Sequence, residues 1–345
     1  MSIPIYLFTD YRKQFYSSTK FRGAAVDLKK LEYFFTEKGF TLIVGSFDEI
    51  DFRKQNYKNQ WVLYQSSEDP SLFYKSYIED MVTGLFIQGA RLIPNLFQFK
   101  AHHNKNFMEI MRDLQPLSEI KNIRSDSYGT YEDYLSKINR YKEGVFVLKT
   151  SATSKSRGVF RLGNEKEKIK LPKTASKTFS FKNFLYYIEF LKTGCKPLLI
   201  SNHRMKFIVQ PYVADLEGDY RIVVYGEKFY ILYRRNRVED FRASGSMKFD
   251  FNITPPDGIF NYARRIFESF NVPFIALDIA FKNGEFYLFE FQFLSFGQYT
   301  SEKSSFYYHY EKNMWKKIME NPDLEREIAA SVILFINKSK NLCAE

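Results

Sequence analysis

The chain has 345 residues, 45% of them hydrophobic and 26% charged, enough for two or three domains with their own cores. Its 51 Lys and Arg against 40 Asp and Glu give a net charge of +11, which favours an anionic partner such as a nucleotide, an acidic substrate or nucleic acid. Only Cys195 and Cys343 are present, so we expect reduced thiols in a cytoplasmic protein and no disulfide framework. The N-terminal residues lack the basic start of a signal peptide, and no apolar run could span a bilayer.

Strands and helices alternate over the first hundred residues. Short apolar runs predict strands at residues 4–9, 40–44, 61–64 and 91–93. Apolar residues at helical spacing predict helices at residues 24–38 and 74–88, each followed by a glycine that ends it. This alternation indicates a small parallel α/β domain.

A polar loop lies at the centre of the next set of elements. We predict helices at 105–114 and 181–191, and strands at 145–148, 159–162 and 206–210. Lys149 ends one strand and precedes the loop Ser151–Gly158. Backbone N–H groups, hydroxyls and a lysine at a strand end can hold phosphates. An ordinary hairpin loop is the alternative interpretation.

An arginine-rich hairpin follows a bend at Gln210-Pro211. Strands are predicted at 220–225 and 228–233, joined by Gly226-Glu227. The arginines in and after this hairpin are Arg221, Arg234, Arg235, Arg237 and Arg242. Arginine can hold a carboxylate or phosphate with two parallel hydrogen bonds. A basic surface that helps solubility or binds RNA is the alternative.

A second hairpin, preceded by a helix at 257–270, places three oxygen-bearing side chains on two strands. Asn283-Gly284 suits a type I′ turn. Glu290 and Gln292 share a face of one strand, and Asp278 on the other strand can face them. Buried carboxylates repel each other unless a cation lies between them, and Mg²⁺ prefers such oxygen ligands. Solvated acids on a half-exposed hairpin are the alternative. Residues 303–340 are predicted to be mainly helical, with a break at Pro322.

The order of these features resembles the ATP-grasp enzymes, and most closely the RimK-type carboxylate–amine ligases. In that group a D-I-R triplet precedes a hairpin with Gly five residues after the Arg, and R-R and D-F-R follow. The matching residues, at the same spacing, are Asp219-Tyr220-Arg221, Gly226, Arg234-Arg235 and Asp240-Phe241-Arg242. The resemblance covers residues 90–300 and leaves residues 303–345 outside.

This resemblance implies an α/β (α+β) fold of the ATP-grasp type, in which two α+β subdomains hold ATP. The expected domains are an N-terminal α/β domain (1–100), a central lid subdomain with the phosphate loop (101–205), a C-terminal subdomain with the metal site (206–302) and a helical segment (303–345). It also implies a ligase that joins a carboxylate to an amine through an acyl phosphate and releases ADP and phosphate.

Site residues follow from the same resemblance. Those implied to hold the phosphates of ATP are Lys105, Lys149, Ser151, Ser154, Ser156 and Gly158, with Arg235 at the γ-phosphate. Gln210 and the backbone of Tyr212 and Val213 would bind adenine, and Asp219 the ribose. Two Mg²⁺ ions, which Mn²⁺ could replace, would be held by Asp278, Glu290 and Gln292. Arg242 would stabilise the acyl phosphate, so Arg242, Arg235 and Lys149 are the expected catalytic residues.

Four positions depart from the family pattern. Gln292 replaces a metal-binding Asn, Ser244 replaces the Asn after D-F-R, Pro211 replaces a Glu, and the phosphate loop is rich in Ser where Gly is usual. A kinase of the same fold, acting on a small acidic substrate, is one alternative function. A basic RNA-binding module is the other, and the acidic residues of the metal set argue against it. The acceptor is expected to be an acidic or phosphorylated sugar or peptide, and a dimer is compatible with the sequence.

Overall fold

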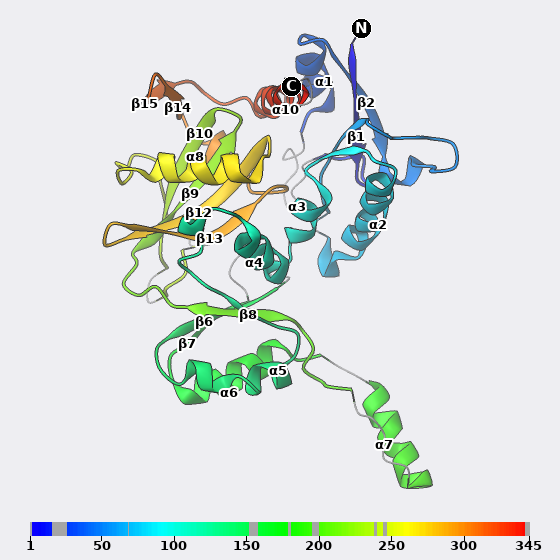
Figure 1. The fold of residues 1–345 in the computed structure, drawn as a ribbon, viewed down its shortest axis with the longest axis vertical. Helices are drawn as coiled ribbons and strands as arrows, with labels where there is room; N and C mark the ends of the chain where they lie inside the picture. The colour runs from blue at the N-terminus through cyan, green and yellow to red at the C-terminus, as the bar shows by residue number, and fades with distance from the viewer. Residues whose placement is uncertain are drawn as a thin grey trace. The chain divides into compact units, whose positions relative to one another are not determined.

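The computed structural model describes residues 2–15, 26–67, 69–151, 158–178, 181–194, 200–237, 240–243 and 247–341 (Figure 1). The chain forms two compact units. The larger unit comprises Met1–His102, Gln115–Ile120 and Leu216–Glu345, and the smaller unit comprises His103–Leu114 and Lys121–Asp215. Within the described residues, no helix combines the length and the apolar character needed to cross a membrane.

A parallel four-stranded sheet forms the N-terminal part of the larger unit, as predicted. Its strand order is β2-β1-β3-β4, and all its neighbouring strands pair in parallel. The strands are β1 (Ile3–Thr9), β2 (Phe40–Ser46), β3 (Trp61–Tyr64) and β4 (Arg91–Ile93), and the helices are α1 (Leu28–Thr36), α2 (Phe73–Ile87) and α3 (Leu96–Ala101). The side chain of Asp27 accepts hydrogen bonds from the Lys29 and Lys30 N–H groups and so caps α1.

The second sheet of the larger unit has seven strands. Its main path runs β13-β12-β9-β10-β14-β15, and β11 also pairs with β10. The strands are β9 (Gly218–Tyr225), β10 (Lys228–Arg235), β11 (Phe249–Asp250), β12 (Phe274–Lys282), β13 (Glu285–Gln292), β14 (Phe306–Glu311) and β15 (Met314–Met319). Asn283 and Gly284 join β12 to β13 with φ angles of 52° and 82°, as the predicted type I′ turn requires.

The prediction that residues 303–340 are mainly helical was wrong for its first half. Residues 306–319 form the β14–β15 hairpin, α9 (Tyr299–Glu302) ends before the predicted range, and the helix within that range is α10 (Leu324–Asn341). β14 has the sequence Phe-Tyr-Tyr-His-Tyr-Glu, and a run of aromatic residues favours a strand. Lys312 and Asn313 take positive φ angles at the turn, a Lys-Asn pair that is a weaker turn signal than Asn-Gly.

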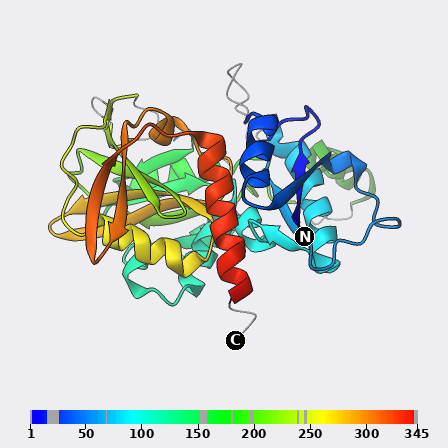
Figure 2. The ribbon, with the colours of Figure 1, turned by 90° about the horizontal axis from the view of Figure 1, so that it is seen from above.

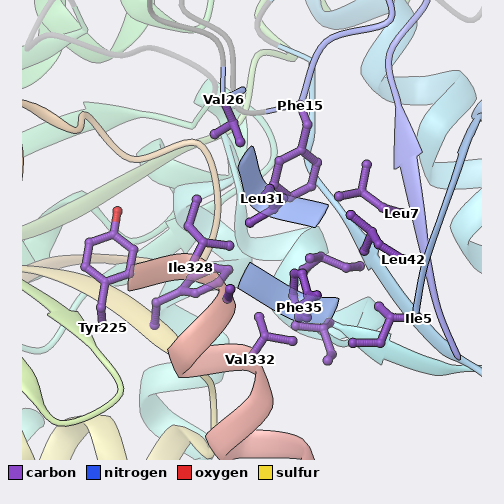
Figure 3. Packing of buried hydrophobic residues seen from close by; sticks show 14 of the residues in the cluster. Ile5, Leu7, Phe15, Val26, Leu31, Phe35, Leu42, Tyr225, Ile328 and Val332 are labelled. Atoms are coloured by element: carbon purple, nitrogen blue, oxygen red, sulfur yellow. The ribbon is translucent and has the colours of Figure 1, made fainter. Parts of the chain in front are cut away.

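One hydrophobic core connects the N-terminal sheet with the C-terminal elements. Ile5 and Leu7 of β1, Leu31 of α1, and Ile328 and Val332 of α10 belong to a single buried cluster (Figure 3). Figure 2 shows α10 between the two sheets of the larger unit. Helix α8 (Ile259–Phe270) packs against β12 and β13, with the Phe270 and Phe291 rings 4.7 Å apart. The segments predicted as 1–100 and 303–345 therefore share one core and are not separate domains.

The smaller unit contains an antiparallel sheet in the order β5-β8-β6-β7. Its strands are β5 (Asp126–Tyr128), β6 (Phe146–Thr150), β7 (Val159–Leu162) and β8 (Phe207–Pro211), and its helices are α4 (Lys105–Leu114), α5 (Tyr131–Leu135), α6 (Glu165–Ala175) and α7 (Phe181–Thr193). We predicted that the C-terminal subdomain begins at residue 206. Because β8 lies between β5 and β6, residues 206–215 belong to the smaller unit instead.

Candidate active site

Charged side chains gather on one face of the seven-stranded sheet. Asp278 on β12 lies directly opposite Glu290 on β13 and Arg221 on β9. Gln292 lies two residues beyond Glu290 and shares its face. The other face of β12 and β13 is apolar and lies against α8. The structure therefore brings the three predicted metal ligands together.

A β-bulge produces this alignment. Near the turn, Lys282 pairs with Glu285 and Ile279 with Leu288, and the same register would place Asp278 opposite Phe289. The register shifts between Asp278 and Ile279, because β13 contains one extra residue there. A one-residue shift exchanges the faces of a strand. Without the bulge, Glu290 and Gln292 would point away from Asp278.

Two arginines connect these side chains in a chain of hydrogen bonds. Arg221 donates from Nη1 to Asp278 Oδ1 at 2.7 Å and from Nη2 to Gln292 Oε1 at 2.9 Å. Arg234 Nη2 lies 2.9 Å from Asp278 Oδ2. Arg234 also donates from Nε and Nη2 to the two oxygens of Asp219, at 2.7 and 2.8 Å. All four charged residues are buried, so each relies on its partners to offset desolvation.

The arginines control the ionisation of Asp278. Burial opposes its negative charge, but Arg221 and Arg234 outweigh burial and lower the pKa of Asp278 to about 2. Burial raises the pKa of Asp219. The positive charge of Arg234 opposes this increase, and the negative charge of Asp278 adds to it. Burial also opposes the charge of Arg234, but its two carboxylate partners outweigh it and raise the pKa of that guanidinium. Asp278 is therefore a carboxylate at neutral pH.

The donor set is compatible with Mg²⁺. The part of the chain that the structure describes contains no group of three or more His, Cys, Asp or Glu side chains placed to hold a metal. Mg²⁺, however, commonly binds one or two carboxylates and completes its shell with phosphates and water. Asp278 and Glu290 supply two carboxylates and Gln292 an amide oxygen. Gln292 Nε2 donates to Glu290 Oε1 at 3.1 Å, so the amide and this carboxylate are in direct contact.

Two further predicted residues have clear partners in the larger unit. Asp219, predicted to bind ribose, directs both carboxylate oxygens to Arg234. Arg242 donates to Asp240 from Nε at 2.9 Å and from Nη2 at 2.6 Å, and this contact lowers the pKa of the Asp240 carboxyl. Arg235, in contrast, is exposed and lies 3.5 Å from Asp250. Arg242 and Arg235 thus each contact a nearby carboxylate.

Predicted phosphate-binding residues lie together in the smaller unit. Lys105 begins α4, and its N–H donates to the Ser151 carbonyl at 3.2 Å. Lys149 lies two residues before Ser151, near the end of β6. The Thr150 N–H donates to the Gly158 carbonyl at 2.8 Å and so closes the base of the loop. Ser154 and Ser156 lie outside the described residues.

Residues predicted to bind adenine lie on the next strand of the same sheet. Lys149 pairs with Ile208, and Gln210 pairs with Val147, so Lys149 and Gln210 share one face. Gln210 is buried on the face opposite the tyrosine-rich core of this unit. The Tyr212 N–H donates to Val145 O at 3.0 Å, and Val213 follows as a half-buried residue.

The sequence interpretation missed the structural role of Arg221 and Arg234. It treated the arginines as a general anion-binding group, whereas these two neutralise buried aspartates. The sequence did contain a signal for the pairing of Arg234 with Asp219. A two-residue turn at Gly226-Glu227 pairs Tyr225 with Lys228 and therefore places Arg234 opposite Asp219. It also missed Arg161, whose guanidinium lies 5.2 Å from the centroid of the Tyr212 ring.

Comparison with known proteins identifies the fold. No family model matches the chain, and no curated protein matches it. Among solved structures, the D-cycloserine synthetase DcsG is 12% identical with a TM-score of 0.54, covering 96% of this chain and 99% of that one. A RiPP-associated ATP-grasp ligase from Chryseobacterium gregarium is 13% identical with a TM-score of 0.52, covering 98% and 97%. A RimK domain ATP-grasp protein from Sphaerobacter thermophilus is 12% identical with a TM-score of 0.51, covering 96% and 99%.

The chain of ion pairs predicts that substitutions of two adjacent arginines differ strongly in their effect on stability. Arg234→Met removes the buried partner of Asp219 and leaves Asp278 with Arg221 alone, so we expect a loss of about 3–5 kcal/mol in the free energy of unfolding. Arg235→Met changes an exposed arginine on the same strand and should cost no more than about 0.5 kcal/mol. Urea unfolding followed by circular dichroism measures both. Equal losses in the two variants would contradict the stabilising role of Arg234.

Proposed function

Because the chain has the ATP-grasp fold, we propose that it is an ATP-dependent ligase that joins a carboxylate to an amine and releases ADP and phosphate. A fold by itself hosts many activities, so the proposal needs support from the site. The observation that carries it is the cluster of Asp278, Glu290 and Gln292, aligned by a bulge and supported by Arg221. Oxygen ligands of this kind suit the Mg²⁺ that accompanies ATP.

We assign nucleotide binding to the residues that the sequence motifs indicate. Lys105 and Lys149 bind phosphates, and Ser151, Gly158 and the loop between them, which includes Ser154 and Ser156, cover the γ-phosphate. Gln210, Tyr212 and Val213 bind adenine, since Gln210 shares a sheet face with Lys149. We do not propose Asp219 as a ribose ligand, because both of its carboxylate oxygens accept hydrogen bonds from Arg234. Asp219 instead holds Arg234 in place beside Asp278.

The proposed reaction has two steps. The acid substrate attacks the γ-phosphorus of ATP to give an acyl phosphate and ADP, and the amine then displaces phosphate to give an amide. Bound Mg²⁺ would neutralise charge on the phosphates. Arg235 would bind the transferred phosphoryl group, and Arg242 would stabilise the negative charge that develops at the acyl carbon's oxygen.

An acidic acceptor suits the charge of the chain. The net charge of +11 favours approach of an anion. We therefore propose an acidic or phosphorylated sugar, or an acidic peptide, as the source of the carboxylate. A peptide is compatible with the fold, since a solved ATP-grasp ligase of this fold is in complex with a leader and a core peptide.

The metal assignment predicts a specific effect of Glu290→Ala. Loss of a carboxylate ligand should weaken binding of a non-hydrolysable ATP analogue in the presence of Mg²⁺ at least about tenfold, because even indirect partners of metal ligands contribute that much. Glu285→Ala removes an exposed acid from the same strand and should leave the affinity unchanged. Isothermal titration measures both. Unchanged affinity in Glu290→Ala would exclude Glu290 as a ligand.

The phosphate assignment predicts that Lys149→Ala weakens nucleotide binding. The expected loss is roughly 1–3 kcal/mol, the range for charge-assisted hydrogen bonds. Lys170→Ala, which removes an exposed lysine of α6 in the same unit, is the matched control. Fluorescence titration with a labelled ATP analogue compares the two variants with the parent chain. If both bind as tightly as the parent chain, Lys149 does not contact the nucleotide.

If the reaction proceeds through an acyl phosphate, hydroxylamine should trap this intermediate. When candidate acids are incubated with ATP, Mg²⁺ and hydroxylamine, the correct acid should yield a hydroxamate and an equal amount of ADP. Arg242→Met should reduce hydroxamate formation much more than ATP binding, because Arg242 acts on charge that develops after binding. Arg265→Met, which removes another arginine paired with a carboxylate, should change neither. AMP and pyrophosphate as products would contradict the mechanism, and a stable phosphorylated product that no amine consumes would establish a kinase.

A further inference from the structure

The excess positive charge of the chain lies entirely in the smaller unit. Residues 103–114 and 121–215 contain 21 Lys and Arg but only 10 Asp and Glu. The rest of the chain contains 30 of each and is formally neutral. A single ATP carries too few charges to require such an excess. The smaller unit therefore has the electrostatic character of a surface that meets an extended anion.

Helix α7 in this unit exposes an apolar face. Phe181, Phe184, Leu185, Tyr187 and Leu191 are 58%, 57%, 48%, 57% and 65% exposed. Their spacing places them on one side of the helix. Figure 1 shows α7 apart from α5 and α6 of the same unit. An exposed apolar face of this size marks an interaction surface.

Basic residues surround the base of this helix. Two backbone hydrogen bonds connect the residues after α6 with the segment before β8. The Thr178 N–H donates to Asn202 O at 2.7 Å, and the Met205 N–H donates to Ser176 O at 2.9 Å. The exposed residues Lys173, Lys177 and Arg204 lie next to these contacts. Of the ion pairs between residues that the structure describes, none involves these three or the exposed Lys192 at the end of α7. Their charges are available to an anionic partner.

We propose that α7 and the basic residues at its base bind an anionic lipid surface. Interfacial helices combine an apolar face rich in Phe and Leu with flanking lysines, which attract acidic headgroups while the apolar face enters the boundary with the acyl chains. Helix α7 has 13 residues, about 20 Å of helix, which is shorter than the roughly 30 Å hydrocarbon core. It therefore lies in the membrane surface and does not span it. This peripheral contact would bring the ligase to substrates at a membrane.

Sedimentation with vesicles tests this binding on the full chain. Vesicles of phosphatidylcholine with phosphatidylserine should bind the protein at least roughly tenfold more strongly than phosphatidylcholine alone, given the contribution of each basic residue, and added salt should weaken the binding. Phe184→Ser/Leu191→Ser and Lys173→Glu/Lys177→Glu should each reduce it at least about tenfold. Phe73→Ser/Ile87→Ser, which changes two residues of α2 that are each 78% exposed, is the matched control and should bind like the parent chain.

Two outcomes would overturn the proposal. One is the absence of binding to the acidic vesicles, and the other is an equal loss of binding in the α7 and α2 variants. The first outcome could be accompanied by a dimer of the parent chain, detected by light scattering, that Phe184→Ser/Leu191→Ser dissociates. In that case the apolar face of α7 pairs with a second copy of the chain. Circular dichroism of each variant confirms that the fold is retained.

Discussion

The burial of four charged side chains in the seven-stranded sheet constrains the candidate active site. Asp219, Arg234, Asp278 and Arg221 come from three neighbouring strands, and ion pairs link them in that order. A slip of any strand would leave an unpaired charge in a poorly solvated environment, at a cost of several kcal/mol. We infer that this network fixes the register of β9, β10 and β12, and with it the position of Asp278.

The same network sets the charge of the site. Three carboxylates, of Asp219, Asp278 and Glu290, face the two guanidinium groups of Arg221 and Arg234, so the formal charge is −1. The unbalanced charge lies toward the edge strand that carries Glu290 and Gln292. A divalent cation with bound phosphates would complement that charge. Gln292 is one methylene longer than the usual Asn, and its oxygen lies 2.9 Å from Arg221. The longer side chain thus links the proposed metal ligands to Arg221.

Much of the fold could be predicted because the local signals were strong. The parallel N-terminal sheet followed from its alternating elements, and both hairpins around Gly226 and Asn283 followed from their turns. The alignment of Asp278 with Glu290 was predicted correctly, but it depends on a bulge at Phe289 that no local pattern of the sequence indicates. The β14–β15 hairpin was missed because its Lys-Asn turn is a weak signal. The shared core of α1 and α10 depends on contacts between distant residues, which periodicity cannot reveal.

We propose that Asp278, Glu290 and Gln292 form the metal site of a bound nucleotide. Anomalous diffraction from crystals grown with a non-hydrolysable ATP analogue and Mn²⁺ tests it directly, since the anomalous signal locates the metal independently of any activity. We expect a peak about 2.0–2.2 Å from a Glu290 oxygen, close to the distance for small divalent cations, with the phosphates on the other side of the metal. A nucleotide bound without a peak near Glu290, or a peak only at another site, would contradict the assignment.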